Sequence, residues 1–168
     1  MEFSSTEDLA KSHFSGNLFT IVSGGKLYLV DTMGQVTSQY AAPSGWVYAM
    51  AYGHGSPWYV PHSYSDSVGV YRIDSDSTAI IGSVVSRKLF SIPMRSVDAM
   101  TTDSSGFIIA NEDLLFRFSL HGELRDILES PVSRISGLAW DGESLWVLHH
   151  GPKEAPTDAT LLSRFKFE

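Results

Sequence analysis

Short apolar segments alternate with turn residues along the whole chain. In the second quarter of the sequence this pattern predicts four strands, at residues 47–52, 57–62, 67–73 and 78–85. Side chains alternate between the two faces of a strand, so Ala49 and Ala51 share one face and the bulky Met50 lies on the other. No stretch shows the periodicity of an amphipathic helix. The pattern indicates an all-β protein.

The same order of segments recurs along the chain. Residues 47–62, VYAMAYGHGSPWYVPH, align without a gap with residues 135–150, ISGLAWDGESLWVLHH. Residues 97–112, VDAMTTDSSGFIIANE, fit the same frame, with Asp103 over Asp141, and a weaker copy starts at residue 9. We therefore predict one domain, residues 1–168, made of repeats at about 9–46, 47–96, 97–134 and 135–168.

Four antiparallel strands repeated about every 40 residues are typical of propeller blades. The segment from Gly137 to Val147, GLAWDGESLWV, followed by an apolar strand, resembles blades of the six- to eight-bladed β-propellers that include NHL-type, glutamine-cyclotransferase-like and streptogramin-lyase-like proteins. The resemblance covers nearly the whole chain and implies a propeller-like fold. Each sheet of such a repeat buries its faces only against its neighbours, so Trp58 and Trp146 are expected in the blade cores.

The last repeat stops after its predicted third strand, residues 161–167, and lacks an outer strand. An unpaired sheet edge invites pairing with another strand. Residues 2–6, EFSST, are predicted to supply that strand, within one chain or between two. Three arrangements follow: a four-bladed ring closed on itself, a homodimer of two half-rings, or part of something longer. Closed symmetry favours the dimer.

Composition narrows the classes of partner. The formal net charge of −7 argues against nucleic acid or an anionic membrane surface as a partner. The absence of cysteine excludes disulfides, thiolate zinc sites and a cysteine nucleophile. The start, MEFSSTEDLAKSHF, lacks the basic and apolar regions of a signal peptide, which makes the cytoplasm the default location; export with a removed signal is the alternative.

The propeller resemblance places two sets of loops on one face, around the central channel. The predicted loops between second and third strands are residues 23–26, 62–67, 111–113 and 149–159, and the predicted connections between blades are residues 41–46, 86–96 and 129–134. Loops carry binding residues more often than the scaffold does. We call the candidate ligand-binding residues of this face the rim: Trp46, His62, Tyr64, Arg95, Asn111, Glu112, Arg134, His149 and His150.

Two kinds of chemistry fit the rim. Imidazole and carboxylate groups bind divalent cations, so His62, Glu112 and His150 are candidate metal ligands, and the rim is also a candidate site for an acidic ligand; ordinary exposed loop residues are the alternative. His149 and His150 point to opposite sides of an extended segment, so we do not expect both on one ion. No other cofactor is predicted. Trp46 and Tyr64, in loops, are candidate aromatic contacts for a ligand or a partner.

These features predict a ligand- or protein-binding propeller module that uses the rim. The alternative is a metal-assisted lyase or hydrolase with a site at the channel mouth shared between two chains, and a third reading is a structural assembly unit. The resemblance implies the mouth as the location of a site, but the full catalytic pattern of those families is not matched. Binding is therefore favoured over catalysis.

Overall fold

The computed structural model describes residues 9–10, 18–23, 26–31, 33, 35–41, 47–73, 86–155 and 159–166. These residues form strands and turns, which confirms the predicted all-β class. Across these ranges no helix is long and apolar enough to cross a membrane. Every pair of neighbouring strands is antiparallel.

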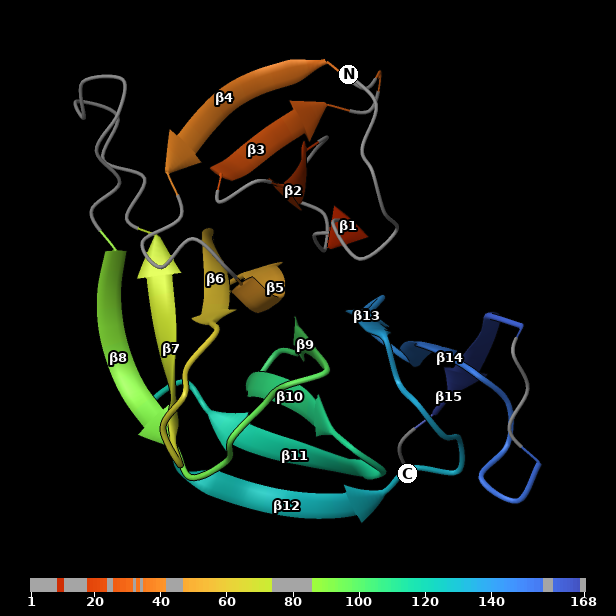
Figure 1. Ribbon diagram of the computed structural model, residues 1–168. Helices are drawn as coiled ribbons and strands as arrows, with labels where there is room; N and C mark the ends of the chain where they lie inside the picture. Colours follow the sequence, from red (N-terminus) through yellow and green to blue (C-terminus); the bar gives the residue numbers. More distant parts are fainter. Residues whose placement is uncertain are drawn as a thin grey trace.

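The described strands form four sheets, each made of strands consecutive in the sequence (Figure 1). The first contains β1 (Leu9–Ala10), β2 (Leu18–Ser23), β3 (Lys26–Asp31) and β4 (Val36–Ala41). The second contains β5 (Val47–Gly53), β6 (Ser56–Pro61), β7 (Val68–Ile73) and β8 (Ser86–Ile92). The third contains β9 (Ala99–Thr102), β10 (Gly106–Asn111), β11 (Leu114–Ser119) and β12 (Leu124–Glu129). The fourth has three strands, β13 (Gly137–Trp140), β14 (Leu145–His149) and β15 (Leu161–Phe165).

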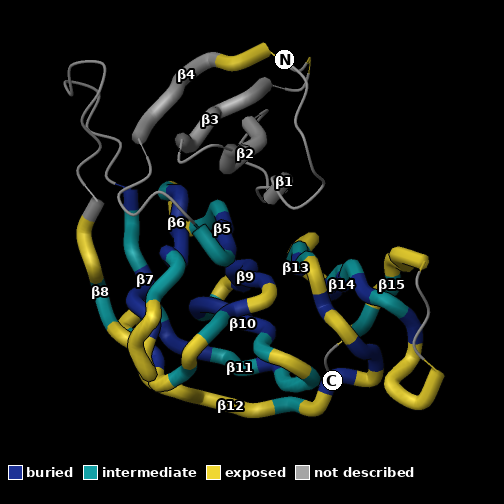
Figure 2. The backbone as a smooth tube through the Cα atoms, viewed as in Figure 1, coloured by how far each residue is buried: buried dark blue, intermediate teal, exposed yellow. Residues whose placement is uncertain are grey.

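The sheets follow one another around a common centre. Figure 1 shows β5, β9 and β13 on the inside and β4, β8, β12 and β15 at the periphery. Close packing between sheets joins β1 and β2 to β5, β5 to β9, and β9 to β13. Burial follows this arrangement, since β9 and β10 are buried whereas β12 is exposed along most of its length (Figure 2).

Strand register repeats from sheet to sheet. The pairs Ala51↔Trp58, Thr101↔Ile108 and Ala139↔Trp146 occupy the same place in the second, third and fourth sheets. The repeat is therefore structural as well as sequential. In the first sheet, Thr20 holds the place of Trp58 and pairs with Ala10. The repeat frame that starts at residue 9 predicts residue 13 as its partner. The first strand of this weakest copy is therefore shifted relative to the predicted frame.

Among the described residues, two hydrophobic cores fill spaces between sheets. One lies between the second and third sheets, where Trp58 meets Phe107 edge-on at 4.9 Å between ring centroids. The other lies between the third and fourth sheets and includes Ile108 and Leu145. The expectation for Trp58 is met. The expectation for Trp146 is wrong, because its side chain is half-buried and belongs to neither core.

Strand β8 lies later in the chain than the sequence predicted. The fourth strand of this repeat was expected at residues 78–85, which lie outside the described residues, and residues 86–96 were expected to be a connection. Instead Ser86–Ile92 is a strand paired with β7. The centroid of the Phe90 ring lies 5.7 Å from that of Phe107 and 6.4 Å from that of Phe118. The additional residues of the second repeat therefore precede its last strand, which is held in place by aromatic packing.

Candidate functional site

A pocket of about 440 Å³ lies between the segment that follows β8 and strands β11 and β12. Its volume is in the range of small-molecule binding sites. The apolar part consists of Pro93, Met94, Phe116, Phe118 and Leu124, and the polar part includes Arg95, Ser96, Asn111 and Glu112. The structure thus brings three rim residues, Arg95, Asn111 and Glu112, to one cavity.

Arg95 is already paired at the mouth of this pocket. Its Nε donates a hydrogen bond to Asp66 Oδ1 at 2.8 Å, and both side chains are more than four-fifths exposed. The pair connects the loop between β6 and β7 to the segment after β8. Because the guanidinium charge is balanced by Asp66, Arg95 adds little net positive charge to the mouth.

Hydrogen bonds to the segment before β9 fix the positions of Asn111 and Glu112. Asn111 Nδ2 donates to Ser96 O at 2.8 Å and to Ser96 Oγ at 3.1 Å. The Glu112 backbone N–H donates to Asp98 Oδ2 at 2.6 Å, and Glu112 has a positive φ of 54°. Burial raises the pKa of Asp98, and the hydrogen bond from Glu112 opposes that rise. In the described part of the chain, no cation pairs with the exposed Glu112 carboxylate, so it leaves one free negative charge at the mouth.

A second rim cluster is aromatic. The His62 ring lies 4.7 Å from Tyr48 and 4.7 Å from Tyr64, centroid to centroid. Tyr64 itself is fully exposed. The loop that carries it is ordered by serines: Ser63 Oγ and Ser65 Oγ are 2.7 Å apart, and Ser65 N–H donates to Ser63 Oγ. This loop presents a tyrosine to solvent in a defined position.

The two histidines after Leu148 have different environments. His149 is buried, with Gly151 N–H donating to its Nδ1 at 3.0 Å and its Nε2 lying 2.8 Å from Ser163 Oγ. Both ring nitrogens therefore have hydrogen-bond partners within the fold and are not available to a ligand. His150 is half-buried, and its Nδ1 has no hydrogen-bond partner among the described residues. The adjacent pair does not face one ligand, in keeping with its extended backbone.

The remaining rim residues lie apart. Arg134 is exposed, with a positive φ of 51°, in the connection between β12 and β13. Trp46 lies outside the described residues. Over the ranges that are described, no three His, Asp or Glu side chains gather closely enough to hold a metal ion. His62, Glu112 and His150 thus do not form one cation site within a single chain, and a site shared between two chains stays a prediction.

Sequence reasoning aligned Asp103 with Asp141 but gave neither a role. Asp103 Oδ1 accepts hydrogen bonds from the Ser105 and Gly106 backbone N–H groups, and Oδ2 lies 2.8 Å from Arg117 Nη2. Burial alone raises the pKa of Asp103, but the hydrogen bonds from Ser105 and Arg117 outweigh burial and lower it. The sequence did carry a signal for this motif. An aspartate recurs in the turn after the first strand of the third and fourth repeats, and in both an arginine follows two strands later.

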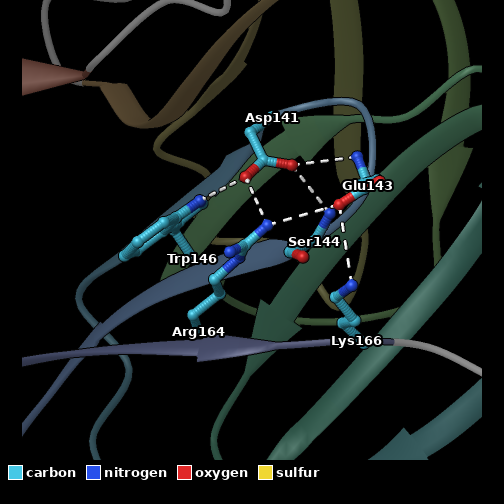
Figure 3. A network of polar contacts seen from close by, with 6 residues as sticks. All are labelled: Asp141, Glu143, Ser144, Trp146, Arg164 and Lys166. Atoms are coloured by element: carbon cyan, nitrogen blue, oxygen red, sulfur yellow. Dashed lines mark hydrogen bonds and ion pairs between the residues drawn. The ribbon is translucent and has the colours of Figure 1, made fainter.

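The equivalent group in the fourth sheet is shown in Figure 3. Asp141 Oδ1 accepts from the backbone N–H groups of Glu143 and Ser144, and Oδ2 accepts from Trp146 Nε1 at 2.7 Å. The hydrogen bond from Trp146 is the largest cause that lowers the pKa of Asp141 to about 2. Arg164 lies 3.6 Å from Oδ2 and 5.5 Å from the Trp146 ring centroid. This network orients the outward-facing Trp146.

Comparison with known proteins defines the fold. No family model matches the sequence, and no curated protein matches it. A luciferin-regenerating enzyme matches 95% of this chain and 60% of its own, with 16% identity and a TM-score of 0.58. The computationally designed Ika4 protein matches 99% of this chain and 96% of its own, with 13% identity and a TM-score of 0.54. Virginiamycin B lyase from Staphylococcus aureus matches 88% of this chain and 51% of its own, with 15% identity and a TM-score of 0.51.

The similar structures are β-propeller proteins, WD40 domains among them, and the fold is therefore of the β-propeller type. At these identities the likeness extends to the fold alone. The chain spans about half the length of most of these solved structures.

Proposed function

We propose that the protein is a binding module whose pocket beside β11 takes a ligand with an apolar body and a cationic end. The observation that carries this proposal is the pocket itself, with aromatic and aliphatic side chains inside and polar groups at its mouth. Sites of this composition bind through the apolar part and orient the ligand through the few polar groups.

The charge at the mouth supports a cationic end. Arg95 is balanced by Asp66, whereas Glu112 has no countercharge among the described residues. The whole chain carries a net charge of −7, which attracts cations to the mouth. Tyr64 extends the same face as an exposed aromatic contact, so a protein with a basic side chain beside an apolar one is as suitable a ligand as a free amine.

A matched pair of small probes tests the pocket and its charge preference separately. We expect 4-phenylbutylamine to perturb backbone amide resonances of residues 91–96 and 111–124 in NMR titrations, and 4-phenylbutyrate to bind more weakly. Glu112→Gln should weaken amine binding by about two- to fivefold, because exposed ion pairs contribute about 0.2–1 kcal/mol. Equal binding of both probes would refute the charge preference, and no perturbation by either would refute the pocket.

Two variants on one strand control for general effects of substitution. Leu124 lines the pocket and Ile127 does not, yet the two are 51% and 49% exposed on β12. Leu124→Arg should abolish amine binding by filling the pocket with a positive charge, and Ile127→Arg should leave it unchanged. Equal losses in both variants would count against the pocket.

A further inference from the structure

The fourth sheet presents a partly exposed face that is apolar at Trp146, Leu148 and Leu162 and carries Arg164 beside Trp146. Along β14, Leu145, Val147 and His149 are buried, whereas Trp146 and Leu148 point to the other side. Leu148 pairs with Leu162 of β15, so their side chains share that side. We call Trp146, Leu148 and Leu162 the Trp146 face. Leu162 is 62% exposed.

The equivalent face is covered in the two preceding sheets. Ile108 and Leu115 of the third sheet hold the places of Trp146 and Leu162, by sequence frame and by strand register. They are 0% and 4% exposed because the fourth sheet packs on them. In the second sheet, Trp58 is likewise buried against the third. Each such face is therefore covered by the sheet that follows in sequence.

No following sheet covers the Trp146 face in the described ranges. Close packing runs from β1 and β2 to β5, then to β9 and β13, and does not link the fourth sheet to the first in the same way. Continuation of the same packing order would place a further sheet on the Trp146 face. Among the described residues, the first sheet of the same chain packs on β5 without close packing on the fourth sheet, and Figure 1 shows it bordering the same opening as β13.

We infer that the Trp146 face binds the first sheet of a second copy of this chain, so that two copies related by twofold symmetry close one ring. The contact continues the sheet-to-sheet packing already present within the chain, and twofold symmetry produces it twice. The lengths of two larger propellers agree with this inference, because the chain covers 51% of the virginiamycin B lyase and 49% of a β-propeller domain from Myceliophteria thermophila, whereas it covers 96% of the designed Ika4 protein. The inference does not depend on the pocket.

The solution mass of the full chain tests the inference. Light scattering on a sizing column should give twice the 18.5 kDa of one chain. Leu162→Arg should halve that mass, because it places a charge in the contact, whereas Ile127→Arg, a comparably exposed position outside the Trp146 face, should leave it unchanged. Circular dichroism of both variants checks that the strands are retained.

Hydrogen exchange of the wild-type chain gives a second test that needs no substitution. Amides of β14 and β15 should exchange faster after dilution, and those of β10, in the interior of one chain, should not. A wild-type mass of one chain at every concentration would overturn the inference, as would a dimer that persists in folded Leu162→Arg. Protection of β14 and β15 that is independent of concentration would instead favour closure by the first sheet of the same chain.

Discussion

The third and fourth sheets carry the same local motif in different surroundings. In both, a turn aspartate accepts backbone N–H groups and faces an arginine two strands later. The Asp103 side chain is 5% exposed and lies 2.8 Å from Arg117, whereas the Asp141 side chain is 35% exposed and lies 3.6 Å from Arg164. The third sheet is covered on both faces and the fourth on one. Equivalent residues in the two sheets are therefore expected to contribute different amounts to the free energy of unfolding, depending on what packs beside them.

The largest expected difference concerns two equivalent leucines. Leu115→Ala should destabilise the fold by about 2–5 kcal/mol, because it removes buried methyl groups and leaves a cavity. Leu162→Ala should lower the unfolding free energy of the monomeric chain by no more than about 0.5 kcal/mol, since its side chain is 62% exposed. Urea unfolding at low protein concentration measures both. Equal losses would show that Leu162 is buried within a single chain.

A smaller difference is expected between the two aspartates. Asp103→Asn should lower the unfolding free energy by about 1.5–3 kcal/mol, the usual range for hydrogen bonds to a charged group, because the ion pair of the largely buried Asp103 side chain with Arg117 is lost. Asp141→Asn should destabilise less, because water solvates both groups there. Unfolding at low and high salt checks the assignment: added salt should weaken only the Asp141 contribution. The reverse order would contradict the comparison of the two sheets.

The smallest effect is the dependence of stability on pH. The folded-state pKa values of Asp103 and Asp141 are lowered, so both stabilise the fold above the ordinary value of 3.8 and lose this contribution as pH falls through the folded-state pKa. For Asp141 the loss falls between pH 3.8 and about pH 2. The raised pKa of Asp98 acts in the opposite direction: its contribution to stability is present at low pH and is lost as pH rises through the folded-state pKa. The unfolding free energy over this interval should fall less in Asp141→Asn than in wild type, and an unchanged slope would contradict the shift.

The candidate site was only partly predictable from the sequence. Arg95, Asn111 and Glu112 were on the predicted rim, but the pocket that joins them also needs Met94, which follows the unexpected strand β8, to lie near Phe116 of β11. His149 carried the same sequence signal as His150, yet its Nε2 lies 2.8 Å from Ser163 Oγ in the interior. Alternation places a side chain on a face of a strand and does not specify what lies opposite that face.

The amino-acid sequence by itself determined the local architecture, because alternation, turn residues and the repeated frame act over a few residues each. The β5, β6 and β7 strands, the recurring Asp103 and Asp141 turns and the all-β class follow from it. Only tertiary structure decided where β8 lies, that Trp58 is buried while Trp146 is not, and where a pocket forms. These features depend on contacts between sheets far apart in the chain, where packing selects among strands of similar local preference.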